Sequence, residues 1–130
     1  MNEIKILKEN SKFAYAPYSN FKVSAVLVTK SGKVYTGVNV ENASYGGTVC
    51  AERVAIFKAV SEGELEFDRI YLYVEDKDGN HPIVPPCGIC RQVMSEFSMD
   101  MKVIMVGDND KQEISSVKEL LPHHFDSDFL

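Results

Sequence analysis

The sequence has no apolar run long enough to cross a membrane. Its longest apolar stretches, such as Val23–Val28, cover a handful of residues, whereas a spanning helix needs about 20. It also lacks an excess of positive charge. Lys and Arg number 14 against 19 Asp and Glu, a formal net charge of −5, and nucleic-acid binders typically carry a basic surface. The composition therefore predicts a protein that binds neither membranes nor nucleic acids.

Targeting and repeat signals are missing as well. Residues Met1–Asn10 alternate Glu and Lys with Ile and Leu, which is unlike a signal or transit peptide. No internal repeat, low-complexity tract or Ser/Gly linker divides the 130 residues, a length that suits one domain. We therefore expect a single globular domain spanning residues 1–130, located in the cytoplasm.

Cysteine is scarce, but its number is informative. There are three cysteines, and an odd number cannot close into a set of intramolecular disulfides. Cys50 stands alone, whereas Cys87 and Cys90 form a Cys-x-x-Cys pair. In a reducing compartment, clustered cysteines more often bind metal or do chemistry. Three thiolates on one Zn²⁺ leave the fourth tetrahedral position open, which is the arrangement of catalytic zinc sites.

The hydrophobic pattern predicts alternating helices and strands. The expected elements are a first helix that begins near Ile4 and is broken at Ala16-Pro17, strands Phe21–Thr29 and Val34–Asn39, helix Val49–Ser61, strand Ile70–Val74, helix Gly88–Phe97, strands Lys102–Val106 and Lys111–Ile114, and a short helix Val117–Leu121. This order predicts an α/β fold of three layers, α/β/α, with a mixed sheet of about five strands. The first two strands and the last two are each expected to pair as an antiparallel hairpin, because turn residues separate them.

Cys50 and Cys87 each open a predicted helix. The N-terminus of a helix is locally positive and favours a thiolate, which is the form that binds zinc. Cys90 follows Cys87 by three residues, so both lie on the same side of the first turn. The two helix N-termini are therefore expected to hold one Zn²⁺ between them.

Two charged residues follow Cys50 directly. Glu52 is placed to face the open metal position and to carry protons to and from water. Three thiolates and Zn²⁺ sum to a negative charge, and Arg53 is positioned to offset it by donating hydrogen bonds to the thiolates. The alternative is a structural zinc-binding interaction module, in which His81 is the fourth ligand and Glu52 is only a favourable charge at a helix start.

The motifs resemble a known family. Cys50-Ala51-Glu52 with Pro86-Cys87-Gly88-Ile89-Cys90 is the three-cysteine form of the zinc-deaminase signature. Residues 16–23, 37–45 and 86–92 are similar to the small homotetrameric cytidine deaminases, and the resemblance runs from about Ser11 to Leu121. One departure is Ser24, where the family usually has glycine. We expect a packing adjustment there, because the position lies within a predicted strand.

The resemblance implies an activity and a set of roles. In this family, water activated by zinc attacks C4 of cytosine while a glutamate, here Glu52, protonates N3 and the leaving ammonia. The positions that match the family's substrate-binding residues are Phe21, Asn39, Glu41 and Ala51, with Asn39 and Glu41 as the ribose-binding pair. Alternation supports the pair, since residues two apart on a strand share a face.

The resemblance also implies a tetramer whose pockets lie at subunit boundaries. An aromatic residue near the C-terminus of a neighbour closes each pocket, and both Phe125 and Phe129 are candidates. The Glu41 carboxylate would repel a phosphate, so the expected substrate is a free nucleoside, cytidine or deoxycytidine, in pyrimidine salvage. Blasticidin-S deaminase shares the cysteine motifs and is an alternative, although the run from Asn39 to Tyr45 favours cytidine.

Overall fold

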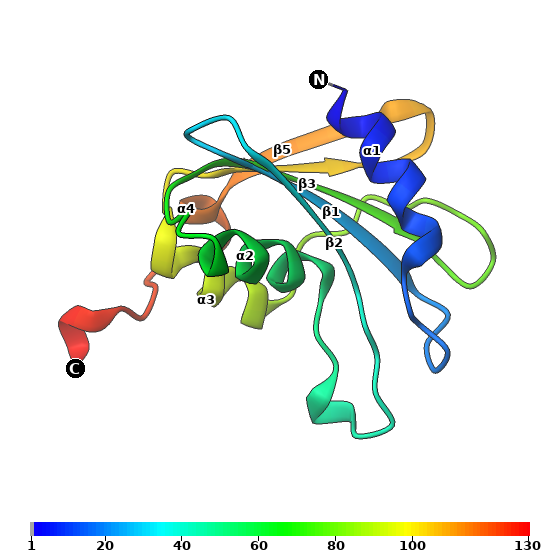
Figure 1. Ribbon diagram of the computed structural model, residues 1–130, viewed down its shortest axis with the longest axis horizontal. Helices are drawn as coiled ribbons and strands as arrows, with labels where there is room; N and C mark the ends of the chain where they lie inside the picture. The colour runs from blue at the N-terminus through cyan, green and yellow to red at the C-terminus, as the bar shows by residue number, and fades with distance from the viewer. Residues whose placement is uncertain (1) are drawn as a thin grey trace.

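A five-stranded sheet forms the middle layer of the structure, a computed structural model that describes residues 2–130 (Figure 1). The strands are β1 (Lys22–Thr29), β2 (Val34–Val38), β3 (Phe67–Glu75), β4 (Lys102–Val106) and β5 (Gln112–Ser116). Their order across the sheet is β2-β1-β3-β4-β5. Only β3 and β4 run parallel, and the other three pairs are antiparallel. The predicted mixed sheet and its closing antiparallel pair are confirmed.

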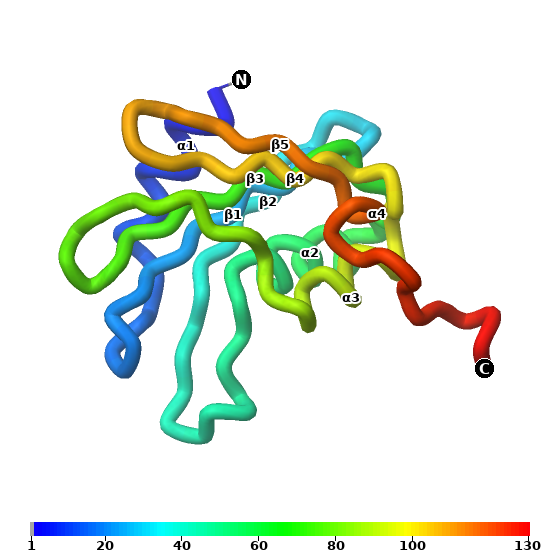
Figure 2. The backbone as a smooth tube through the Cα atoms, turned by 180° about the vertical axis from the view of Figure 1, so that it is seen from behind, coloured from blue at the N-terminus to red at the C-terminus, as the bar shows by residue number. Residues whose placement is uncertain are grey.

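Helices cover both faces of this sheet, as Figures 1 and 2 show from opposite sides. The helix α1 (Glu3–Asn10) lies on one face, and α2 (Ala51–Ser61), α3 (Gly88–Phe97) and α4 (Val117–Leu120) lie on the other. Each face has its own core. Leu7 of α1 packs with Val26 and Ile104, whereas α2 and α3 pack on the larger cluster that includes Leu27. The expected α/β/α layering is therefore confirmed.

The interior position of β1, between β2 and β3, explains its valine-rich sequence. Successive side chains of a strand point to opposite faces, and both faces of β1 are covered. Ala25 and Leu27 enter the core under α2 and α3, while Val26 enters the core under α1. A strand buried on both sides needs apolar residues at consecutive positions rather than at alternate ones.

The first helix ends earlier than the sequence pattern predicts. α1 stops at Asn10, and Ser11–Phe13 forms a 3-10 turn. Ala14 is extended, with ψ at 130°, and Tyr15 pairs with the segment that follows β2. The Tyr15 amide donates to the Asn39 carbonyl at 2.9 Å, and the Glu41 amide donates to the Tyr15 carbonyl at 2.9 Å. This pairing requires extended backbone, so the helix cannot reach Tyr15.

Three other boundaries differ from the prediction by two or three residues. β3 begins at Phe67 rather than Ile70, because Phe67 is buried in the larger core and pairs across to β1. β5 runs to Ser116 rather than ending at Ile114, since its register with β4 continues to the start of α4. α2 begins at Ala51, and Val49 instead bridges to Val40. None of the helices in residues 2–130 is long and apolar enough to span a bilayer.

Candidate active site

The three cysteines meet at the N-termini of two helices. Cys50 is the N-cap of α2, Cys87 is the N-cap of α3, and Cys90 lies in the first turn of α3. Their three sulfur atoms all lie within 4.8 Å of one another. Cys90 is buried, Cys50 is partly buried and Cys87 is exposed. The convergence expected from the sequence spacing is therefore present, and one side of the cluster is open.

The thiols have unequal affinities for protons. The pKa of Cys50 is lowered from 9.0 to about 5, mainly because the Cys90 thiol hydrogen-bonds its sulfur, with further contributions from Arg53 and Cys87. The pKa of Cys90 is raised, because its thiol donates to Cys50 and because it is buried. Hydrogen bonds to its sulfur and the nearby Arg53 guanidinium therefore favour Cys50 as a thiolate.

Arg53 is the positive partner of this charge. Its Nη2 lies 3.5 Å from Cys50 Sγ, which is the contact expected of a residue that compensates thiolate charge. Its Nε is buried and has no hydrogen-bond partner among the described residues. The guanidinium therefore has one unused N–H donor, which could form a hydrogen bond with a further thiolate.

The donor set fits zinc. Two sulfurs that bind one tetrahedral zinc at about 2.3 Å lie about 3.8 Å apart, and the sulfurs of Cys50 and Cys87 are 3.7 Å apart. Thiolates are among the preferred ligands of Zn²⁺. The positive ends of α2 and α3 add to the charge of Arg53 in offsetting three thiolates. Three protein ligands with one open side are the pattern of a catalytic site rather than of a closed structural one.

Glu52 lies beside the cysteines in the first turn of α2 and is only 4% exposed. Burial raises the pKa of its carboxyl to about 7, and the charge of Cys50 acts in the same direction. The side chain lines the cavity that also reaches Cys50 and Cys87. A buried carboxyl that lines the cavity beside the thiols has the placement required of a proton carrier.

The cavity has a volume of about 390 Å³, within the usual range of small-ligand pockets. Six of its lining residues are expected from the sequence: Phe21, Asn39, Glu41, Cys50, Glu52 and Cys87. Seven others were not: Ser19, Val23, Thr48, Leu72, Val74, Val84 and Pro85. Val84 and Pro85 could have been predicted from the sequence, because they closely precede Cys87. Val23 could have been predicted as well, because strand alternation places it on the same face as Phe21. Leu72 and Val74 required knowledge that β3 pairs with β1.

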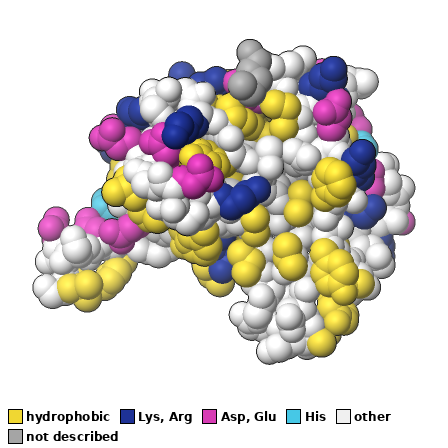
Figure 3. Space-filling view, in the orientation of Figure 1, with side chains coloured by type: hydrophobic (Ala, Val, Ile, Leu, Met, Phe, Trp, Pro, Cys, Tyr) yellow, Lys and Arg dark blue, Asp and Glu magenta, His cyan; other side chains and the backbone are white. Residues whose placement is uncertain are grey.

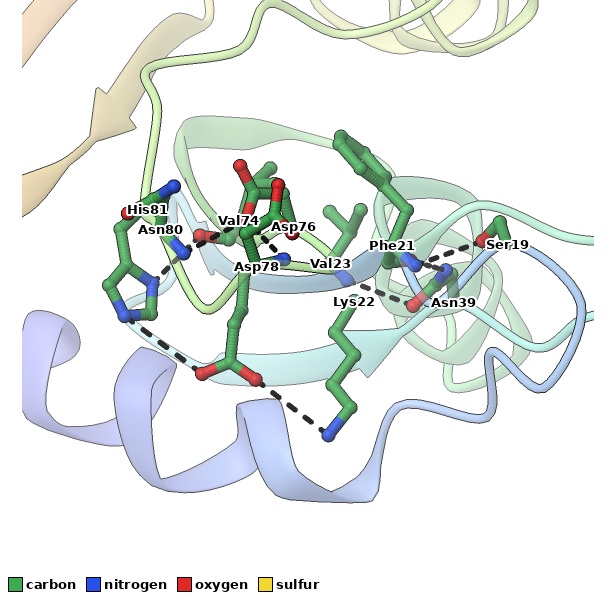
Figure 4. Close-up of polar contacts among 11 residues, drawn as sticks. Ser19, Phe21, Lys22, Val23, Asn39, Val74, Asp76, Asp78, Asn80 and His81 are labelled. Carbon is green, nitrogen blue, oxygen red and sulfur yellow. Dashed lines mark hydrogen bonds and ion pairs between the residues drawn. The ribbon is translucent and has the colours of Figure 1, made fainter.

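The two predicted sugar-binding residues lie just beyond the end of β2 and are held differently. Asn39 Oδ1 accepts from the Val23 amide at 2.9 Å, and its Nδ2 donates to the Phe21 carbonyl at 2.8 Å (Figure 4). Glu41 accepts from the amides of Tyr18 and Ser19 at 3.0 and 3.1 Å and from the Ser19 hydroxyl. These donors lower the pKa of Glu41, the Ser19 hydroxyl most of all. The cavity wall therefore carries an ionised carboxylate.

Other predicted residues lie outside the cavity lining. Ala51 is fully buried against the sheet. Phe125 and Phe129 stack on each other with ring centroids 5.7 Å apart. Both are exposed on the C-terminal tail, which projects from the body in Figures 1 and 3. Their predicted role in a neighbouring pocket remains a prediction.

His81 lies away from the thiols. Its ring stacks on Tyr73 at 4.7 Å, and its Nδ1 lies 2.9 Å from the Val74 carbonyl oxygen (Figure 4). Tyr73 belongs to the opposite face of β3 from the cavity residues Leu72 and Val74. The interpretation of His81 as a fourth zinc ligand is therefore wrong. The alternative of a closed structural zinc site, which required this ligand, is wrong as well.

Comparisons with known proteins agree with this geometry. Residues 3–107 match the family model described as the cytidine and deoxycytidylate deaminase zinc-binding region. A cytidine deaminase from Halalkalibacterium halodurans is 50% identical over 114 residues, which cover 86% of this chain and 83% of the relative. The crystal structure of the cytidine deaminase from Burkholderia pseudomallei superposes with a TM-score of 0.86 at 44% identity, covering 95% of this chain and 96% of that one.

The alternative considered from the sequence also has a relative. A blasticidin-S deaminase from Bacillus cereus is 35% identical over 104 residues, which cover 77% of this chain and 74% of the relative. Its identity and coverage are both lower than those of the Halalkalibacterium protein. The comparisons therefore favour the nucleoside enzymes over the antibiotic deaminase.

Proposed function

Because this chain belongs to the cytidine and deoxycytidylate deaminase family, we propose that it catalyses the hydrolytic deamination of cytidine and deoxycytidine. The products are uridine or deoxyuridine and ammonia, a reaction of pyrimidine salvage. The single observation that carries the proposal is one cavity of about 390 Å³ that is lined by two of the three converging thiols, by the buried Glu52 and by Glu41. The proposed zinc-binding residues and the proposed sugar-binding residue of a nucleoside site therefore face the same cavity.

Cys50, Cys87 and Cys90 are the residues that hold the zinc ion. When bound, zinc supplies a Lewis acid that lowers the pKa of water and so provides a nucleophile near neutral pH. Arg53 then donates to the thiolates from Nη2, and its unpartnered Nε is available for a second bond. These hydrogen bonds reduce the negative charge that three thiolates place next to the reacting carbon.

Glu52 moves the protons. The oxygen of water forms a bond to C4 of cytosine, and the bond from C4 to the exocyclic nitrogen breaks. One water proton is delivered by Glu52 to N3 and the other to the departing amino group, which leaves as ammonia. The burial of Glu52 supports this role, because a carboxyl removed from bulk water exchanges protons with the substrate rather than with solvent.

Asn39, Glu41 and Phe21 bind the nucleoside. Backbone groups hold the Asn39 side chain, and backbone amides with the Ser19 hydroxyl hold Glu41 in the cavity lining. The Glu41 carboxylate accepts hydrogen bonds from the sugar hydroxyls. Phe21 supplies an aromatic wall for the base. The same carboxylate repels a nearby phosphate, so we expect a nucleoside to be preferred to a nucleotide.

The active form is proposed to be a homotetramer of one-domain subunits in the cytoplasm. The exposure of Phe125, at 55%, and of Phe129, at 69%, supports an intersubunit contact, because both rings lie on a tail that projects from the body. Tyr45 is 78% exposed and lies on the loop after β2, which also extends away from the sheet. Figure 3 shows apolar side chains over this part of the face, which supports a second intersubunit contact there. A neighbour's Phe125 would close the pocket, with Phe129 as the competing candidate.

The test is loss of cytidine absorbance by the purified protein, compared with cytidine monophosphate and blasticidin S. We expect turnover of cytidine and deoxycytidine, loss of activity when zinc is chelated, and recovery when zinc is restored. Glu52→Gln should keep zinc and fold while losing at least about 10²-fold in kcat. Equal turnover of cytidine monophosphate would refute the nucleoside preference, and turnover of blasticidin S alone would favour the antibiotic enzyme.

A further inference from the structure

The Ser19 hydroxyl joins two parts of the cavity wall. It accepts a hydrogen bond from the Phe21 amide at 3.0 Å (Figure 4) and donates to Glu41 Oε2. A serine hydroxyl has one proton to donate, and here that proton is directed to the carboxylate. The hydroxyl therefore links the backbone that carries Phe21 to the acid proposed to bind the sugar.

The two oxygens of Glu41 are restrained by different groups. Oε1 accepts from the backbone amides of Tyr18 and Ser19 at 3.0 and 3.1 Å, whereas Oε2 accepts from the Ser19 hydroxyl. The Ser19 hydroxyl is the one side-chain donor to this carboxylate in the described part of the chain. Removing it would leave the Oε1 bonds in place and free the carboxylate to rotate about them.

A tight turn fixes the position of the hydroxyl. Asn20 adopts a left-handed conformation, with φ of 55°, and its amide donates to the Ala16 carbonyl at 3.0 Å. Asn tolerates this conformation better than most residues. The turn brings the Phe21 amide back onto Ser19 Oγ, so the hydroxyl is oriented before any ligand binds.

We propose that Ser19 is a positioning residue that orients the Glu41 carboxylate toward the sugar hydroxyls and so sets the preference for a nucleoside with a hydroxylated sugar. This inference rests on the proposed function, because it assigns Glu41 to the sugar. Ser19 acts through Glu41, and among the described residues its hydroxyl forms hydrogen bonds with neither the thiols nor Glu52 but only with Glu41 and the Phe21 amide. Its loss should therefore weaken binding of the sugar and spare the chemical step.

The test measures KM and kcat for Ser19→Ala, Ser19→Thr and the wild type with cytidine and with 2′,3′-dideoxycytidine. Dideoxycytidine lacks the two hydroxyls that Glu41 would bind, so it reports on every other effect of the variant. Where its turnover is slow, its inhibition constant against cytidine replaces KM. Ser31→Ala is the matched control, because Ser31 donates to the Glu64 carboxylate at 2.6 Å in an exposed turn outside the cavity lining.

For cytidine, Ser19→Ala should raise KM about tenfold and leave kcat within about twofold, since a carboxylate that has lost a hydrogen bond from Ser19 is less well oriented to bind the sugar, whereas the groups that perform the chemical step are unchanged. For dideoxycytidine the same variant should behave as the wild type. Ser19→Thr restores a hydroxyl and should recover most of the loss, and Ser31→Ala should change neither constant.

Three results would overturn the inference. These are an unchanged KM for cytidine in Ser19→Ala, an equal rise in KM for both nucleosides, and a loss that Ser19→Thr leaves uncorrected although zinc content and melting temperature are normal. If the wild type fails to deaminate cytidine, the proposed function fails first and the inference falls with it. The wild-type assay thus separates the two failures.

Discussion

Gly37 and Ala51 touch where α2 begins. A Cβ atom at Gly37 would lie 2.2 Å from the Ala51 carbonyl oxygen and 2.7 Å from the Ala55 amide nitrogen. Both are backbone atoms of the helix whose N-terminus carries Cys50 and Glu52. Gly37 lies in β2, two residues before Asn39. This contact therefore sets the spacing between the metal end of the site and the sugar end.

Gly37→Ala should be strongly destabilising. The added methyl group meets rigid backbone, so α2 must move away from β2, and overpacking of this kind costs about 3 kcal/mol. We expect the melting temperature to fall by roughly 10 °C and deaminase activity to fall with it. Thermal unfolding followed by circular dichroism measures the effect. Gly46→Ala is the control, because no atom lies within 4 Å of its added Cβ, and equal melting of the two variants would contradict the prediction.

Ser24→Ala should stabilise the protein. Ser24 is fully buried in β1, and its Oγ has no hydrogen-bond partner among the described residues. Burying an unpaired hydroxyl is unfavourable, so its removal should add about 1 kcal/mol to the free energy of unfolding. Denaturant titration measures the gain. Thr29→Val is the contrasting variant, since Thr29 Oγ1 accepts from the Lys33 amide at 3.0 Å, and it should destabilise. A loss of stability in Ser24→Ala would mean that the hydroxyl has a partner.

Arg53→Gln should weaken zinc binding about 10- to 100-fold, the usual cost of removing a group that supports metal ligands. The glutamine retains hydrogen-bonding ability but removes the positive charge that faces Cys50 Sγ at 3.5 Å. Competition with a chromophoric chelator measures the zinc affinity independently of activity. Arg53→Lys keeps the positive charge but lacks the planar guanidinium, so its zinc affinity should lie between those of the wild type and Arg53→Gln. Wild-type affinity in Arg53→Gln would show that the helix N-termini alone offset the thiolates.

The Glu41 carboxyl should titrate below its ordinary pKa of 4.5, because the Ser19 hydroxyl and the two backbone amides favour the ionised form. Since the pKa is lower in the folded state, the resulting stability is present above 4.5 and is lost as the pH falls through the folded value. Nuclear magnetic resonance of ¹³C-labelled glutamate measures the midpoint directly. Ser19→Ala should move the midpoint upward, and a wild-type midpoint at or above 4.5 would contradict the contacts described for Glu41.

Local patterns predicted most features of the metal end of the site. The spacing of Cys87 and Cys90 depends only on helical geometry, and the placement of Cys50 and Cys87 at helix starts follows from the residues around each one. Glu52 and Arg53 are tied to Cys50 by the same turn of α2. Interactions within one turn of a helix are set by the neighbouring sequence, so the contact from Arg53 to Cys50 is predictable locally. The meeting of Cys50 with Cys87, 37 residues away, was predicted instead from the need of one zinc ion for several thiolates.

Contacts between distant segments were not predictable in the same way. His81 was interpreted as a possible zinc ligand because it precedes Cys87 by six residues, yet the loop places its ring against Tyr73 on the other face of the sheet. The sequence pattern predicts a first helix that includes Tyr15, because the pairing of Tyr15 with Asn39 and Glu41 has no signal in the local pattern. Ser19 was missed for the same reason, since its partner Glu41 lies 22 residues away.

The sequence by itself determined the chemistry of this protein: three thiols for zinc, the acid Glu52 and the cation Arg53 beside them, and the order of strands and helices. These depend on residue type and on interactions a few positions apart, which the chain carries wherever it folds. Only the tertiary structure decided which groups share a cavity and how they are held. Pairing of β1 with β3, the Gly37 contact with α2 and the hydrogen bonds from Ser19 to Glu41 arise when distant segments pack together, because packing selects one arrangement among many that local preference allows.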